Sequence, residues 1–148
     1  MPVIGINNSA KQAAALAKVN NTLANSDLII PIGASQSFIG RFYLPINLAG
    51  TASGAQVQIT VPAGGTTYLV GYEICNGNSA TIVQADQIVA SAAFSNALAN
   101  ATDHFFSGFI TIVNGATAGN ITVQFAQLVT DAAAATLLAG AWISGTLI

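Results

Sequence analysis

The stretch A-Q-V-Q-I-T-V, Ala55 to Val61, is the clearest indication of how this chain folds. Its valine and isoleucine residues alternate with glutamine and threonine, the pattern of a strand that has one buried face and one hydrated face. Pro62 and Gly64 follow at once and end the strand. A second stretch, N-I-T-V-Q-F from Asn120 to Phe125, repeats the alternation. Both patterns predict strands of an antiparallel sheet that has one hydrated side.

Short apolar runs separated by Gly, Asn, Ser and Pro continue from Leu28 onward, without helical periodicity. With the two strands above they give about eight strands, so we predict an all-β fold, a single eight-stranded antiparallel jelly-roll sandwich over residues 28–148. The stretch Ala90–Thr102 lacks alternation and is expected to be a long loop that carries one helical turn. The remaining strands are expected at Leu28–Ile32, Ser37–Leu48, Tyr68–Asn76, Thr81–Val89, Phe105–Val113 and Thr136–Leu147.

Two of these runs, Phe38–Leu48 and Phe105–Val113, are apolar on both faces. A strand of this kind in a small antiparallel fold needs cover on its outer side as well as on its core side. The composition agrees, because only 5% of the 148 residues are charged and 53% are apolar, whereas soluble domains carry about 25% charged residues. Uncharged surface of this extent indicates a chain that is buried in an oligomer.

Membrane and nucleic-acid functions are not supported. No stretch approaches the roughly 18–20 unbroken apolar residues that a membrane-spanning helix requires, and the richest, Ala132–Ile143, is interrupted by Thr136 and Gly140. A formal net charge of −2 gives no basic footprint for nucleic acid. The N-terminus shows no signal peptide, so we expect a chain that is mature from Met1. Cys75 is the only cysteine, which excludes an intrachain disulfide and fits synthesis in a reducing cytosol.

Residues 1–27 differ from the rest because they lack aromatic residues and hold two of the three basic ones, Lys11 and Lys18. Ser9 and Gln12 have the spacing of a helix capping box, and Leu16, Val19 and Leu23 fall near one helical face. These patterns predict an N-terminal arm over residues 1–27 that is compatible with a short helix. An apolar stripe this thin orders only against a partner.

The sequence offers little for catalysis. His104 is the only histidine, and Asp103 beside it points to the opposite face of a strand, which prevents an Asp–His dyad. One histidine with one cysteine cannot supply a usual zinc-ligand set, and a small buried thiol is the simpler interpretation of Cys75 beside Glu73. Trp142 could serve as a sugar platform, although packing in the core or an interface is favoured. We expect no catalytic, metal-binding or cofactor-binding residues and no enzymatic activity.

The C-terminal third resembles a known family. The runs G-N-I-T-V-Q-F-A-Q, Gly119–Gln127, and T-D-A-A-A-A-T-L-L-A-G-A-W, Thr130–Trp142, resemble the closing strands of trimeric jelly-roll domains in structural proteins of tailed phages. An upstream F-x-G-x-I-x-I run, Phe106 to Ile112, matches the pattern that precedes those strands. Such domains, similar to the tumour-necrosis-factor fold, occur in capsid decoration (cement) proteins and in fibre heads. Ala141 stands where the family often has Ser. The resemblance implies no catalytic residues.

Together these observations predict a virion structural protein, a capsid decoration protein that forms a homotrimer and bridges subunits of the major capsid protein. It would be made in the host cytoplasm and lie on the outer surface of the capsid. The short arm favours this role over the alternative, a receptor-binding fibre head, and a lectin-like or cupin-like enzyme lacks the metal-ligand histidines. The candidate arm residues that bind the capsid are Lys11, Leu16, Lys18, Val19 and Leu23, and the trimer-interface candidates are Phe106, Ile110, Phe125 and Trp142.

Overall fold

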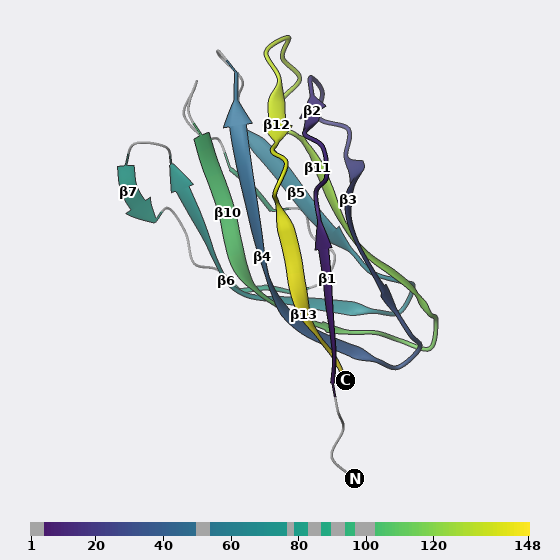
Figure 1. Cartoon of the computed structure of the whole chain (residues 1–148). Coiled ribbons are helices and arrows are strands. Elements are labelled where there is room, and N and C mark those ends of the chain that lie inside the picture. Colours follow the sequence, from purple (N-terminus) through teal and green to yellow (C-terminus); the bar gives the residue numbers. More distant parts are fainter. Residues whose placement is uncertain (1–4, 50–53, 77–78, 83–86, 90–93, 97–102) are drawn as a thin grey trace.

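The computed structural model describes residues 5–49, 54–76, 79–82, 87–89, 94–96 and 103–148, and among these it describes the side chains of residues 5, 7–49, 54–67 and 103–148. Every regular element in these ranges is a β-strand (Figure 1). The strands are β1 (Ile6–Lys11), β2 (Leu16–Lys18), β3 (Ala24–Ile32), β4 (Ser37–Leu48), β5 (Ala55–Thr60), β6 (Thr66–Asn76), β7 (Ser79–Ile82), β8 (Gln87–Val89), β9 (Phe94–Asn96), β10 (Asp103–Val113), β11 (Gly119–Gln127), β12 (Ala135–Leu137) and β13 (Trp142–Leu147).

The strands pair as one long hairpin that is folded over on itself. The first strand pairs antiparallel with the last, the second with the second-last, and so on toward the middle of the chain. The pairs are β1 with β13, β2 with β12, β3 with β11, β4 with β10, β5 with β9 and β6 with β8. β7, in the middle of the series, pairs with β6. A long hairpin rolled into two layers is the topology of a jelly roll.

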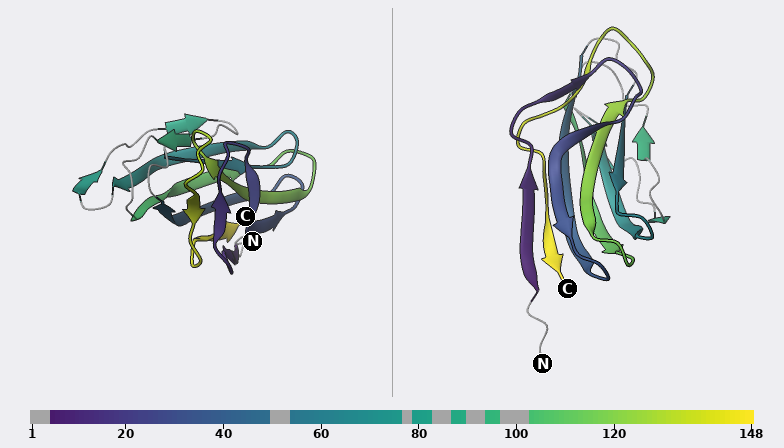
Figure 2. Two further views of the ribbon diagram at one scale, coloured as in Figure 1. Left: turned by 90° about the horizontal axis from the view of Figure 1, so that it is seen from above. Right: turned by 90° about the vertical axis from the view of Figure 1, so that its right-hand side faces the viewer.

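The pairs distribute into two sheets that face each other (Figure 2). One sheet has nine strands, in the order β1-β13-β4-β10-β6-β7, with β12 beside β4, β2 beside β12 and β8 beside β6. The other has four strands in the order β3-β11-β5-β9. The predicted all-β antiparallel sandwich is therefore confirmed. Among the described strands, eight have six or more residues and the other five have three or four.

Most strand predictions are confirmed closely because alternation and turn residues mark them well. The expected strand Ser37–Leu48 is β4, and Asn120–Phe125 lies within β11. The single strand expected over Thr81–Val89 is described as two short ones, β7 and β8. In the stretch expected to be a loop with a helical turn, residues 94–96 form β9, and residues 90–93 and 97–102 lie outside the described residues.

Residues 6–27 do not stand apart as an arm. β1 pairs with β13 over its whole length and β2 pairs with β12, so the two ends of the chain together extend the nine-stranded sheet (Figure 2, right). The expected boundary after residue 27 falls inside β3. Ser9, expected to cap a short helix, instead pairs with Ser144 in the sheet. The helical spacing was misleading because the backbone groups of this segment find their partners on β13, far away in the sequence.

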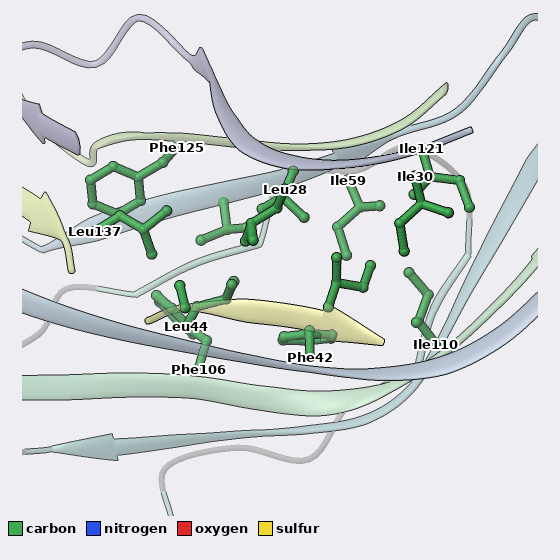
Figure 3. Close-up of a cluster of buried hydrophobic side chains, with 14 of the residues drawn as sticks. Leu28, Ile30, Phe42, Leu44, Ile59, Phe106, Ile110, Ile121, Phe125 and Leu137 are labelled. Carbon is green, nitrogen blue, oxygen red and sulfur yellow. The ribbon is translucent and has the colours of Figure 1, made fainter. Parts of the chain in front are cut away.

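The core lies between the two sheets (Figure 3). The nine-stranded sheet contributes Phe42 and Phe106, and the four-stranded sheet contributes Ile59 and Phe125. Each is at most 2% exposed, and burying a side chain of this size contributes about 1.5–3 kcal/mol relative to leaving it in water. Phe38 also points inward, over the facing glycines Gly40 and Gly145. The two glycines leave the room that its ring occupies.

One end of the sandwich is closed by three turns that meet around Asn114. The buried Asn114 side-chain amide donates to the carbonyl oxygens of Gly33 and Thr117, at 2.8 Å each. The Ser35 amide donates to the Gly115 carbonyl at 2.7 Å. Gly64, in the turn between β5 and β6, lies so close to Gly115 that a Cβ on Gly115 would be 2.8 Å from the Gly64 carbonyl oxygen. The Asn114 side chain thus links the turn after β3 to the turn after β10.

Candidate interaction face

The outward side of β4, β10 and β13 carries the most unusual surface of the described chain. These strands are neighbours, β13 beside β4 and β4 beside β10. In β4 and β10 the even-numbered residues point into the core and the odd-numbered ones point out, whereas β13 has the opposite phase. The outward positions hold large apolar and aromatic residues. We call this surface the aromatic face, and define it as Ile39, Arg41, Tyr43, Phe105, Phe109 and Trp142.

Cross-strand pairing orders these side chains. Trp142 lies directly opposite Tyr43 in the register, and their rings are stacked with centroids 6.5 Å apart. Phe105 packs on the other side of Tyr43, with centroids 5.3 Å apart. Arg41 lies opposite Phe109, and its guanidinium carbon is 4.4 Å from the centre of that ring. Facing pairs of this kind interact favourably across a sheet, so the aromatic face is already arranged before any partner arrives.

A shallow groove of about 450 Å³ crosses the aromatic face. Ile39, Arg41, Phe109, Trp142 and Ser144 line it together with the glycines beneath. Among the described residues, the groove lining has one charged group, the Arg41 guanidinium, and no carboxylate. Apolar rings and one weakly hydrated cation form a surface that is easily desolvated. Such a surface suits contact with another macromolecule.

Exposed apolar side chains concentrate here. In the described part of the chain eight large hydrophobic residues are exposed, and five of them point outward from the same sheet around the aromatic face: Ile39, Phe109, Val113, Trp142 and Ile148. Ile39 is 52% exposed and Phe109 is 51% exposed. Single exposed hydrophobic residues are ordinary, whereas a contiguous group marks a contact surface.

The outward side of the four-stranded sheet is different. Its outward positions on β5 and β11 hold mainly glutamine and threonine, and Gln58 lies directly opposite Gln124. The Gln124 side-chain amide donates to Asn25 Oδ1 at 2.8 Å, so the amides bond to one another along the surface. Ile29 is the one large hydrophobic residue that this sheet exposes among its described positions. We call this surface the amide face and define it as Asn25, Ile29, Gln56, Gln58, Thr60 and Gln124. Its amide and hydroxyl groups suit contact with water.

Three of the four expected trimer-interface residues point the wrong way. Phe106, Ile110 and Phe125 are at most 1% exposed and belong to the core between the sheets. Their side chains pack within this chain, between the two sheets. Trp142 lies on the aromatic face and is 37% exposed. The residues missed from sequence are its neighbours Ile39, Arg41, Tyr43 and Phe109, whose strands were recognised as apolar on both sides.

The expected capsid-binding residues are not equivalent. Leu16 packs against the core and Leu23 is partly buried, whereas Val19 is 50% exposed. Lys11 is exposed at the end of β1, and Lys18 lies on β2. The expected single stripe of three apolar residues is thus divided between packing and exposure. Of the three, Val19 has the largest exposed side chain.

Gln12 has a role that its sequence pattern did not reveal. It is buried and joins three segments: its backbone N–H donates to Ala141 and its carbonyl accepts from Gly140. Its side chain accepts from the Asp27 amide at 2.9 Å and donates to the Ala14 carbonyl at 2.7 Å. Gln12 therefore anchors the connection from β1 to β3. No local pattern predicts this role, because all but one of its partners are distant in sequence.

The described residues show no arrangement for catalysis. Asp103 is exposed and His104 is buried, as expected from their opposite faces, and Asp103 accepts a hydrogen bond from Asn47 at 2.8 Å. Within the described ranges no three His, Cys, Asp or Glu side chains gather where a metal could bind. The side chains of Glu73 and Cys75 lie outside the described residues. In the same ranges no helix is long and apolar enough to cross a bilayer.

Comparison with known proteins yields no family. No family model and no curated protein matches this sequence. Similar solved structures include "Structure of infectious bursal disease virus Gt strain", with 9% identity and a TM-score of 0.27 over 98% of this chain and 41% of that one. "Crystal structure of infectious bursal disease virus VP2 subviral particle" has 10% identity and a TM-score of 0.27, over 99% and 42%. This chain spans about two fifths of their length. The jelly-roll topology is established by the strand pairing and not by this likeness.

Proposed function

We propose that this protein is a virion structural protein, a capsid decoration protein that forms a homotrimer and bridges subunits of the major capsid protein on the outer surface of the particle. The observation that supports it most is the pairing of an exposed aromatic face with an amide face on one small jelly roll that has 5% charged residues. A chain of this kind is stable when one side is covered and the other is hydrated. That is the situation of a subunit in a surface-bound oligomer. We assign no catalytic role to any residue.

The alternative function, a receptor-binding fibre head, would place its recognition side chains on loops. Every aromatic side chain that the structure describes instead lies on a strand. Aromatic rings on the flat side of a sheet favour packing between subunits over capture of a small receptor epitope. The arrangement therefore supports the decoration role.

Attachment to the capsid is assigned to the segment around β2, at the end of the sandwich opposite the Asn114 turns (Figure 1). Val19 is exposed there, and Lys18 supplies a positive charge. Three copies of this segment in a trimer would bind together, so weak individual contacts multiply through effective concentration. Because residues 6–11 and 16–18 belong to the sheet, deleting the segment would damage the fold, and a point substitution is the cleaner probe.

The test is co-sedimentation of the protein with undecorated capsids assembled from the major capsid protein of the same genome. We expect wild type to bind, Val19→Asp to bind at least tenfold more weakly, by roughly 1.4 kcal/mol or more, and the matched surface variant Ile29→Asp to bind like wild type. Failure of wild type to bind would overturn the decoration role. Equal binding by Val19→Asp and Ile29→Asp would overturn the assignment of the attachment segment and leave the role intact.

A further inference from the structure

We infer that the aromatic face is the surface through which copies of this chain pack against one another, each copy turning its aromatic face toward the trimer axis. This inference rests on the proposed function, in that it locates the interface of the proposed trimer. Its first support is position: five of the eight exposed large hydrophobic residues of the described chain lie on this side of the nine-stranded sheet. Covering them removes the largest apolar group from water.

The second support is the charge of the aromatic face, because it limits which kind of partner surface can pack against it. The aromatic face carries a single charged group, Arg41, whose guanidinium lies over the Phe109 ring. No carboxylate is found among the described residues that line the groove. A partner with several charged groups would have to desolvate them against apolar rings, and Arg41 is the one group of the aromatic face that could compensate a charge. A second copy of this chain meets the requirement, since it presents the same nearly uncharged surface.

The amide face determines which orientation of the copies is favoured, because its polar groups are more stable in water than against apolar rings. If the aromatic face packed against the amide face of the next copy, the glutamine and threonine groups would lose water without gaining partners. The amides there already bond along the surface, as Gln124 does to Asn25. Packing aromatic faces toward a common axis covers all of them and leaves every amide face in water. It also produces a closed ring, which ends assembly at a defined number of copies.

The aromatic face is also pre-ordered in a way that favours association. Tyr43 is held between Trp142 and Phe105, and Arg41 is held on Phe109. Side chains already fixed by their neighbours lose little conformational freedom when a partner arrives. Tyrosine, tryptophan and arginine are also the residue types that contribute most at protein interfaces. The structure therefore assigns the largest effects to Trp142, Tyr43 and Arg41.

The experiment compares Ile39→Asp, on the aromatic face, with Ile29→Asp, on the amide face; the two isoleucines are 52% and 41% exposed. Static light scattering at micromolar concentration should give wild type and Ile29→Asp a mass about three times the chain mass of 14.9 kDa, and Ile39→Asp the mass of one chain. Circular dichroism verifies that each variant is folded. If Ile39→Asp does not fold, Phe109→Ser replaces it, because it removes an exposed ring without adding charge.

The outcomes separate the two proposals. A wild-type monomer would overturn the trimer of the proposed function and the interface with it. A wild-type trimer that persists in both Ile39→Asp and Phe109→Ser would overturn the interface alone. A trimer that Ile29→Asp dissociates, while Ile39→Asp does not, would place the contact on the amide face. Dissociation by the aromatic-face variants only would establish the inference.

Discussion

The two sheets of this jelly roll share one core but turn unlike surfaces outward. The four-stranded sheet presents amide and hydroxyl groups: β5 alternates between apolar and polar residues over its whole length, and β11 does so from Asn120 to Phe125. The nine-stranded sheet presents Ile39, Tyr43, Phe109 and Trp142, since its central strands β4 and β10 are apolar on both sides. A strand that alternates between apolar and polar residues thus has one side in water. A strand that is apolar on both sides indicates that a partner covers its outer side, because nothing in the single chain does so.

The sharpest comparison lies within β10, where Phe106 points into the core and Phe109 points outward. In the monomeric Ile39→Asp background, Phe106→Ala should lower the free energy of unfolding by about 3–5 kcal/mol, because it leaves a cavity. Phe109→Ala in the same background should change it by about 0.5 kcal/mol, as an exposed residue does. Urea unfolding of the two variants measures this. Equal losses would show that the two rings are not on opposite sides of the sheet.

A second contrast sets the tight inner side of the nine-stranded sheet against its open outer side. A Cβ on Gly145 would lie 2.7 Å from Cζ of Phe38, whereas neighbouring Ser144 is exposed. Gly145→Ala should therefore cost about 1–3 kcal/mol through overpacking, and the control Ser144→Ala should stay within about 0.5 kcal/mol. Thermal melting in the same monomeric background compares them. A harmless Gly145→Ala would mean that the core beneath the aromatic face is loosely packed.

The amide face can be converted into a second apolar face. Gln58→Ile with Gln124→Ile places two isoleucines opposite each other on β5 and β11. The free energy of unfolding should change by about 1 kcal/mol or less, because these positions sit on a solvated strand surface. The mass by light scattering, however, should rise beyond that of the trimer, since a new apolar patch invites further contacts. The control Gln58→Thr with Gln124→Thr should keep the wild-type mass.

The smallest expected effect concerns Arg41 on Phe109, which are separated by 4.4 Å from guanidinium carbon to ring centre. A double-mutant cycle of Arg41→Ala and Phe109→Ala in the monomeric background should give a coupling energy of about 0.5–1 kcal/mol. The amide face has no cation resting on an aromatic ring among its described residues. A coupling energy of zero would show that Arg41 and Phe109 do not hold each other in place before a partner binds.

Alternation and turn residues in the sequence predicted the sandwich and most of its long strands. They did not predict β1, because I-N-N-S-A-K has no apolar alternation and becomes a strand only by pairing with β13. They also predicted that β4 and β10 are covered on both sides, but not which residues point outward. A strand that is apolar on both faces has no phase from which to tell Phe106 from Phe109, so the direction of each side chain came only with the register.

Trp142 provides the most direct measurement of the central claim, because it is the only tryptophan and lies on the aromatic face. We expect acrylamide to quench its fluorescence weakly at concentrations where wild type is trimeric, and several-fold more strongly in monomeric Ile39→Asp, because Trp142 is 37% exposed in a single chain. Ile29→Asp should behave like wild type. Strong quenching in a wild-type sample whose mass is that of a trimer would show that the aromatic face is not where the copies meet.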